Sequence, residues 1–83
     1  MNEKTTIYGT KYRLISVIKE KLKTNFSVTI WTEGLTDEQI MENSNNLNEA
    51  GVTHYYDKVM NAILCFRSKE DMNYFKKELE KYV

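Results

Sequence analysis

The clearest pattern of apolar and polar positions lies near the C-terminus of the chain. Apolar residues recur there at spacings of three, four and three residues, namely Met72, Phe75, Leu79 and Tyr82. Such spacing places the side chains on one side of a helix. Ser68 precedes these residues and suits the N-cap position. The pattern therefore predicts a helix that follows Ser68 and runs almost to the C-terminus.

A second helix is predicted over residues 36–50. Thr36 is followed three residues later by Gln39, a pairing typical of a capping box, and Gly51 suits the left-handed position that follows a helix. The apolar positions form a narrow stripe, namely Ile40, Met41, Leu47 and Ala50. The other positions are polar or acidic, so we expect an outer helix with an acidic face.

A third helix is predicted near the N-terminus, from about residue 10 to residue 23. It has a cationic outer surface and a wide apolar stripe, formed by Leu14, Ile15, Ile18 and Leu22 and widened by Tyr12 and Val17. A stripe of this width is not left in water. We therefore expect the helix to cover a face of a sheet or to pair with a second copy of the chain. Residues 5–8 are a candidate short strand before it, ended by Gly9.

Two further regions have the pattern of strands. In residues 26–32, Phe26, Val28 and Ile30 fall on one side of a strand. Residues 59–66 are an apolar second strand, and the β-forming segment 52–56 before it predicts a hairpin that turns near Asp57.

The register of this hairpin depends on the length of its loop. With three loop residues, His54 shares a side with Ala62, Leu64 and Phe66, whereas with two it lies beside Asn61 and Ile63. We favour three residues, because that register leaves one uniformly apolar face.

The order of the elements from residue 26 onward is strand, helix, strand, strand, helix. A right-handed crossover through the helix at 36–50 places the strand at 59–66 in the middle of the sheet, with both later helices on one face. We therefore predict an α+β fold, a ferredoxin-like two-layer sandwich with a βαββα core. Residues 1–83 form a single domain, in which 26–83 are the core and 1–25 are an extension with a basic helix and a possible short strand.

The charge of the chain is balanced in total but uneven along its length. The 83 residues hold 12 Lys plus Arg and 12 Asp plus Glu, for a net charge of zero. Residues 1–32 carry six cations and two anions, residues 33–57 carry six anions and no cation, and residues 58–83 carry six cations and four anions. This distribution predicts a basic side and an acidic side. The single cysteine excludes an internal disulfide, and no apolar run suits a membrane span or a signal peptide, so we expect a cytoplasmic protein.

Residues 28–79 resemble the RNA-recognition motif family. The most similar part is residues 61–72, where Ala62, Leu64 and Phe66 match the core positions of the family's third strand and Ser68 begins its second helix. Val28-Thr29-Ile30-Trp31, followed by Leu35-Thr36-Asp37-Glu38-Gln39-Ile40, is similar to the first strand and first helix. The resemblance implies an RNA-binding sheet with stacking aromatic residues. Here the corresponding positions hold none, since they are Thr29, Asn61 and Ile63, and the rings of Trp31 and Tyr55 are displaced from them.

The sequence contains no catalytic signature. Cys65 and His54 are the only thiol and imidazole, and the expected hairpin separates them by three or four residues along a strand. His54 is therefore interpreted as a satisfied, partly buried histidine and Cys65 as a small buried apolar residue. Paired carboxylates occur only in first helical turns, and no Cys/His cluster has metal-ligand spacing. We predict no enzyme activity, no metal and no cofactor.

These observations lead to two functional hypotheses. The first is a regulatory protein that contacts RNA through a basic surface, with these binding residues: Arg13, Lys19, Lys23, Trp31, Arg67 and Lys69. The alternative is a protein-interaction module or inhibitor that uses a sheet edge or the acidic helix residues Glu38, Glu42 and Glu49. Lys, Asn, Ile, Tyr and Phe make up 33 of the 83 residues, a composition common in small proteins of phages and of low-GC bacteria, many of which act as binding inhibitors or regulators. An inhibitor encoded by a phage would act against a host protein. Homodimerisation through the N-terminal helix is compatible with both hypotheses.

Overall fold

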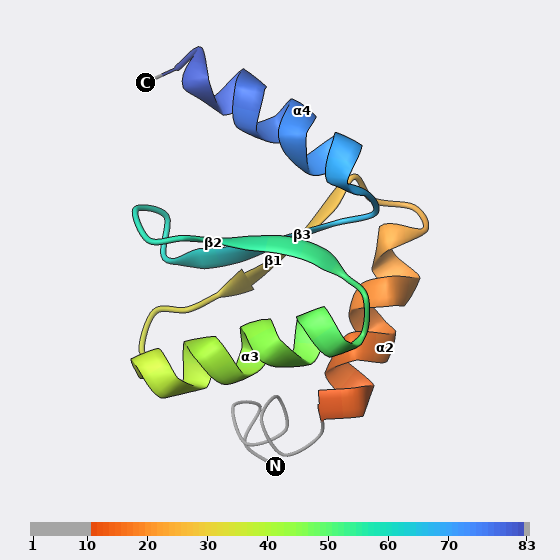
Figure 1. Cartoon of the computed structure of the whole chain (residues 1–83), viewed down its shortest axis with the longest axis vertical. Coiled ribbons are helices and arrows are strands. Elements are labelled where there is room, and N and C mark those ends of the chain that lie inside the picture. The colour runs from red at the N-terminus through yellow and green to blue at the C-terminus, as the bar shows by residue number, and fades with distance from the viewer. Residues whose placement is uncertain (1–10, 83) are drawn as a thin grey trace.

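The computed structural model describes residues 11–82 of the chain (Figure 1). Its elements are, in order, α2 (Lys11–Leu22), β1 (Ser27–Trp31), α3 (Asp37–Glu49), β2 (Thr53–Asp57), β3 (Ala62–Phe66) and α4 (Lys69–Glu80). The α+β class and the three helices are confirmed. The strand predicted at residues 5–8 lies outside the described residues.

The three strands form one antiparallel sheet with the order β1-β3-β2. The central position of β3 is as predicted. Each residue of β3 has a partner on both neighbouring strands, and all five residues from Ala62 to Phe66 are buried. Both faces of this strand must therefore be covered.

One face of the sheet packs against α2 and α3. Ile63 and Cys65 of β3 belong to a core cluster that also contains Ile18 of α2 and Leu47 of α3. The partner residues in the register, such as Val28 opposite Cys65, lie on the same face. The apolar stripe of α2 therefore packs within the chain, which is one of the two alternatives predicted from the sequence. The helix shares this face of the sheet with α3.

The opposite face of the sheet packs against α4, so α3 and α4 lie on opposite sides of the sheet (Figure 1). Phe66 contacts Phe75 of α4, with ring centroids 5.5 Å apart, and it stacks in parallel on Tyr55 of β2 at 6.1 Å. The expected two-layer sandwich with both helices on one face is therefore wrong. Because β3 is apolar on both sides, and α2 shares the first face with α3, the second face needs α4 as its cover.

The hairpin register also differs from the one we favoured. Asp57 lies opposite Ala62, so the loop has four residues, and His54 lies opposite Cys65 on the face that α3 covers. Asp57 Oδ1 accepts hydrogen bonds from the backbone N–H groups of Val59 and Met60, each at 3.0 Å. Asn61 closes the loop with a φ of 57°. We favoured a register that leaves one uniformly apolar face. That criterion could not identify the correct register, because both faces of β3 are apolar.

Both capping signals are confirmed. The Thr36 side chain accepts a hydrogen bond from the Gln39 backbone N–H at 3.1 Å, and the Gln39 side chain accepts one from the Thr36 N–H at 2.9 Å. The Ser68 hydroxyl accepts one from the Asp71 N–H at 3.1 Å. Gly51 follows α3 with a φ of 74°, in the left-handed region.

Candidate nucleic-acid interface

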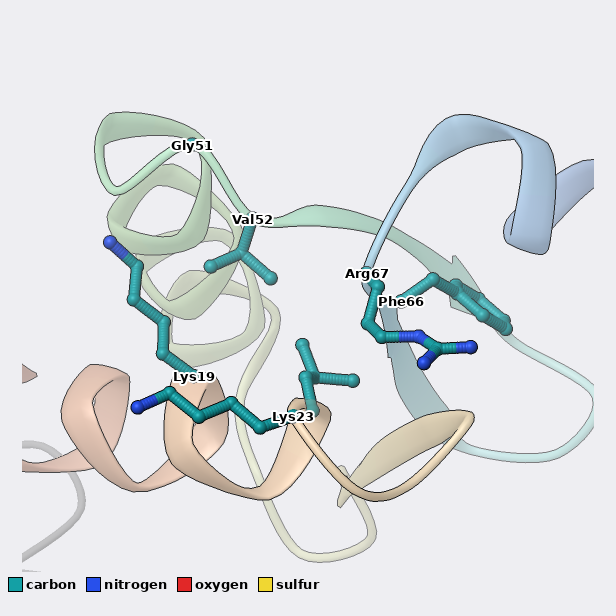
Figure 2. Close-up of a pocket in the computed structure, with 7 residues that line it drawn as sticks. Lys19, Lys23, Gly51, Val52, Phe66 and Arg67 are labelled. Atoms are coloured by element: carbon teal, nitrogen blue, oxygen red, sulfur yellow. The ribbon is translucent and has the colours of Figure 1, made fainter.

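A pocket of about 280 Å³ opens at the end of the sheet where β3 finishes. We call it the basic pocket and define it by its lining residues, which are Lys19, Leu22, Lys23, Gly51, Val52, Phe66 and Arg67. They come from the C-terminal end of α2, the link after α3 and the end of β3 (Figure 2). Every charged residue in this lining is a cation.

The cations lie on two sides of the basic pocket. Lys19 and Lys23 are four residues apart and extend together from the end of α2, whereas the Arg67 guanidinium extends on the other side (Figure 2). A backbone hydrogen bond from Lys23 N–H to the Glu20 carbonyl, at 3.2 Å, continues the turn of α2 and holds Lys23 on the same side as Lys19. The structure therefore brings together three of the predicted RNA-binding residues.

The floor of the basic pocket is apolar. Leu22 and Val52 are buried and lie between the two groups of cations, whereas the buried ring of Phe66 lies on the Arg67 side and packs against Phe75 of α4 (Figure 2). Gly51 lies at the margin, where an added Cβ would meet no atom within 4 Å. The pocket thus combines a cationic rim with an apolar base.

The cations are only weakly engaged by neighbouring carboxylates. Lys23 Nζ lies 3.1 Å from Glu20, and Arg67 Nε lies 3.2 Å from Asp71. Within the described part of the chain, Lys19 has no ion pair. Exposed ion pairs of this kind contribute about 0–1 kcal/mol, so an anionic ligand can replace them at little cost.

Two exposed aromatic rings lie next to the Phe66 ring, although neither of them lines the basic pocket. Phe26 packs edge to face on Phe66, with ring centroids 5.9 Å apart, and Tyr74 packs edge to face on Phe26 at 6.1 Å. Phe26 is 38% exposed and Tyr74 is 60% exposed. Sequence reasoning assigned neither ring to the site. It placed Phe26 on the same side of a strand as Val28 and Ile30, which is wrong, because Phe26 precedes β1 and packs on Phe66, on the opposite face of the sheet. Tyr74 lies off the apolar stripe of α4, and its exposed ring was the one signal that could have found it.

The other predicted RNA-binding residues lie elsewhere. Trp31 pairs with Ala62 at the far end of β3 from Arg67, so the structure does not bring it to the basic pocket. Lys69 is exposed at the start of α4 but does not line the pocket. Arg13 lies in α2, and its side chain is outside the described part of the structure.

The positions that correspond to the stacking residues of the RNA-recognition motif do not share one exposed surface. Ile63 is fully buried in the core beneath α2 and α3. Thr29 pairs with Leu64 on the face that α4 covers, and Asn61 lies in the hairpin loop. Any aromatic stacking must therefore use other residues.

Cys65 and His54 are directly opposite each other, which corrects the expected separation. Burial raises the pKa of the Cys65 thiol to about 12, so the thiolate is scarce at neutral pH. Both ring nitrogens of His54 have other partners, since Nε2 lies 2.8 Å from Ser44 Oγ and Nδ1 lies 2.8 Å from the Val52 carbonyl oxygen. The interpretation of His54 as a satisfied, partly buried histidine is confirmed. This pair does not form an activated thiolate and base.

The three acidic residues of the alternative hypothesis share one side of α3. Glu38, Glu42 and Glu49 are spaced by four and seven residues, which places them along one exposed helix face. Met41 is exposed beside this acidic stripe. The stripe lies on the side of α3 that faces away from the sheet.

A second hollow of about 240 Å³ lies between β2 and α4, lined by Tyr55, Asp57, Lys76, Leu79 and Glu80. Lys76 Nζ lies 4.4 Å from the centroid of the Tyr55 ring, a cation–π contact. The buried Tyr55 hydroxyl has no hydrogen-bond partner among the described protein groups. Burial, followed by the nearby Asp57 carboxylate, raises the pKa of Tyr55.

Residues 11–82 contain no group of three or more His, Cys, Asp or Glu side chains placed to hold a metal ion. No helix in this described region combines the length and apolar character needed to cross a membrane. Comparisons of the chain with protein-family models, with curated proteins and with solved structures found no match.

Proposed function

We propose that this chain is a small, non-catalytic regulatory protein of the cytoplasm that binds single-stranded RNA at the basic pocket. The observation that carries the proposal is the meeting of Lys19, Lys23 and Arg67 around one pocket. Lysine and arginine side chains supply the contacts to phosphate that dominate nucleic-acid affinity.

The rings beside the pocket favour an unpaired strand. Phe26 and Tyr74 are exposed and adjoin Phe66 in the pocket wall, so a base can stack on them while its phosphate meets the cations. Bases must be unstacked from a duplex before they can stack on protein rings. Stacking also tolerates any base, so we expect weak sequence preference.

The resemblance of residues 28–79 to the RNA-recognition motif supports RNA over other polyanions. The βαββα order and the central position of β3 fit the ferredoxin-like class to which that family belongs. The placement of α4 does not fit it. RNA would therefore contact the end of the sheet, outside the face that the family uses.

The proposal predicts a steep dependence of affinity on salt. With three phosphate contacts on a single strand, the logarithmic slope is about −2, so binding weakens by about 20-fold between about 50 mM and about 200 mM salt. Fluorescence anisotropy of a labelled single-stranded RNA oligonucleotide at the two salt concentrations measures this slope, with a hairpin RNA and single-stranded DNA as comparisons.

Matched variants test the two parts of the site. Lys19→Gln/Lys23→Gln should lower the affinity about tenfold or more and flatten the salt slope. The control is Lys77→Gln/Lys81→Gln, because these exposed residues, in the last turn of α4 and at its C-cap, have the same spacing. Lys81 also pairs with Glu78 as Lys23 pairs with Glu20.

A second variant tests the aromatic rings. Tyr74→Ala should lower the affinity by about 1–3 kcal/mol, whereas Tyr82→Ala, which also removes an exposed ring, should not. Equal loss in the lysine variant and its control would contradict a localised site, and absence of binding at low salt would exclude the proposal.

A second candidate function, the binding of a basic protein surface, is favoured by the acidic stripe on α3. Glu38, Glu42 and Glu49 lie on one exposed face of a helix that carries no cation. Replacement of the three by Gln should weaken binding of an arginine-rich peptide at low salt and leave RNA binding unchanged. Unaltered peptide binding would rule out the stripe as the contact surface.

A further inference from the structure

The loop of the β2–β3 hairpin exposes apolar side chains that no other part of the chain between residues 11 and 82 covers. Val59 is 94% exposed, and Met60 follows it. Trp31, which is 66% exposed, lies alongside, because Trp31 pairs with Ala62 and the Thr32 N–H donates to the Asn61 carbonyl at 2.8 Å. We call Trp31, Val59 and Met60 the hairpin tip. Contiguous exposed apolar side chains of this kind mark a contact surface.

The surroundings of the hairpin tip are acidic. Glu33 follows Thr32 directly, and α3 begins at Asp37 and Glu38 on the same end of the sheet (Figure 1). Lys58, in the loop itself, is the single cation in residues 32–61, and Lys76 of α4 lines a hollow together with Asp57. The segments next to the tip along the chain therefore carry four acidic residues, Glu33, Asp37, Glu38 and Asp57, and one basic residue, Lys58.

The basic pocket has the complementary character. Its floor of Leu22 and Val52 is apolar, its rim is cationic, and its volume of about 280 Å³ accommodates a side chain such as that of Val59 or Met60. An apolar projection with an acidic surround and an apolar pocket with a cationic rim match in both charge and polarity. The zero net charge of the chain means that no overall repulsion keeps copies apart.

The tip cannot reach the pocket of its own chain. The tip adjoins Ala62 at the start of β3, and the pocket adjoins Phe66 at its end. These residues are separated by about 13 Å of paired strand, at about 3.3 Å per residue. In Figure 1 the hairpin loop and the link from α2 to β1 lie at opposite ends of the sheet. Contact between them must join two molecules.

We propose that the hairpin tip of one copy docks in the basic pocket of a second copy, so that the chain associates head to tail. Such a contact is heterologous and leaves a free tip and a free pocket at the two ends, so it extends into chains. A contact between one loop tip and a pocket of about 280 Å³ is small, and interfaces below about 1,200 Å² are typical of weak complexes. The association is therefore reversible and dependent on concentration.

If the chain binds RNA as proposed above, this association also regulates that binding; this consequence alone rests on the proposed function. A tip seated in the basic pocket occupies the space between Lys19 and Arg67, so nucleic acid and a second copy compete for one site. The self-association itself requires no nucleic acid, and its test contains none.

Sedimentation equilibrium of the full chain in about 50 mM salt, up to a concentration of about 1 mM, measures the association. The tip variant is Val59→Asn/Met60→Asn, which removes apolar groups without changing charge, and the pocket variant is Lys19→Gln/Lys23→Gln. The controls are Met41→Gln, an exposed apolar residue outside the tip, and Lys77→Gln/Lys81→Gln. Circular dichroism confirms that each variant is folded.

The wild-type chain and both controls should show an average mass that rises with concentration, and each of the two variants alone should remain monomeric. An equimolar mixture of the variants should form a one-to-one dimer, because one supplies an intact pocket and the other an intact tip. A monomeric wild-type chain, variants that associate as the wild type does, or a mixture that stays monomeric would each overturn the proposal. If the wild-type chain self-associates but does not bind RNA, the proposed function is wrong and the proposed self-association stands.

Discussion

His54 and Tyr55 are consecutive residues of β2, and their polar atoms are in opposite states. Both ring nitrogens of His54 have hydrogen-bond partners, Ser44 Oγ and the Val52 carbonyl oxygen, each at 2.8 Å. The buried Tyr55 hydroxyl has no partner among the described protein groups. A buried polar group without a partner lowers the stability of the folded state.

Tyr55→Phe should raise the free energy of unfolding by about 1 kcal/mol, because a buried hydroxyl without a partner lowers the stability of the folded state. Tyr56→Phe is the matched control, since Tyr56 is exposed on the neighbouring position and its replacement should change little. Urea denaturation of the two variants gives the comparison. A loss of stability of similar size in Tyr55→Phe would show that the hydroxyl is satisfied in solution.

Cys65 should make the protein less stable in alkali. Burial raises the pKa of its thiol from 9.0 in the unfolded chain to about 12 in the folded protein. The unfolded chain therefore loses its proton first, so stability is fully present below pH 9 and falls as the pH rises toward 12, by at most about 1.4 kcal/mol per pH unit. Urea unfolding at pH 8, 9 and 10 should give a shallower fall for Cys65→Ala than for the wild type. Identical slopes would assign the fall to other groups, such as Tyr55, whose pKa is also raised.

The helices could be predicted from their capping residues and apolar stripes, but the face of the sheet that each helix covers could not. Thr36 with Gln39, and Ser68, begin their helices as expected. The side of the sheet that each helix covers depends on competition for the two faces of β3. Because Ile63 and Cys65 are as apolar as Leu64 and Phe66, the pattern of that strand favours neither face.

The helix α4 should open more readily than the rest of the fold. It contains no fully buried residue, although Phe75 packs against Phe66. Native-state hydrogen exchange should therefore show weaker protection of the α4 amides than of the amides in β3, because elements with few buried apolar contacts open locally. Phe75→Ala should lower the protection of α4 further and leave β3 nearly unchanged. Uniform protection throughout the chain would mean that α4 unfolds only with the whole domain.

Over the whole molecule, the sequence shows how charge is distributed along the chain, but it does not predict which charged residues meet at the basic pocket. The block of six acidic residues between Glu33 and Asp57 indicated an acidic side, and these residues include the stripe on α3. The basic pocket joins α2 to the end of β3, and this contact depends on long-range packing. The displacement of Trp31 from the pocket follows from its place at the far end of the sheet.

Salt should affect binding and stability differently. The three ion pairs found among residues 14–82 lie between Lys23 and Glu20, Arg67 and Asp71, and Lys81 and Glu78, all at the surface. Raising the salt from about 50 mM to about 500 mM should therefore change the free energy of unfolding by less than about 1 kcal/mol. Chemical denaturation in urea at the two concentrations measures this change. A larger loss would show that the fold depends on charge pairing that the exposed pairs do not supply.

Because β3 is the central strand, the sheet cannot form before β3 has been synthesised. β1 and β2 do not pair with each other, and each has β3 as its neighbour. A growing polypeptide that has reached Asp57 therefore holds two strands without a partner between them. The sheet can assemble only after Phe66 has left the ribosome, and the hairpin of β2 and β3 is then the nearest pair to close. A chain that is truncated before residue 62 would contain two unpaired strands. We therefore expect proteases to degrade it readily.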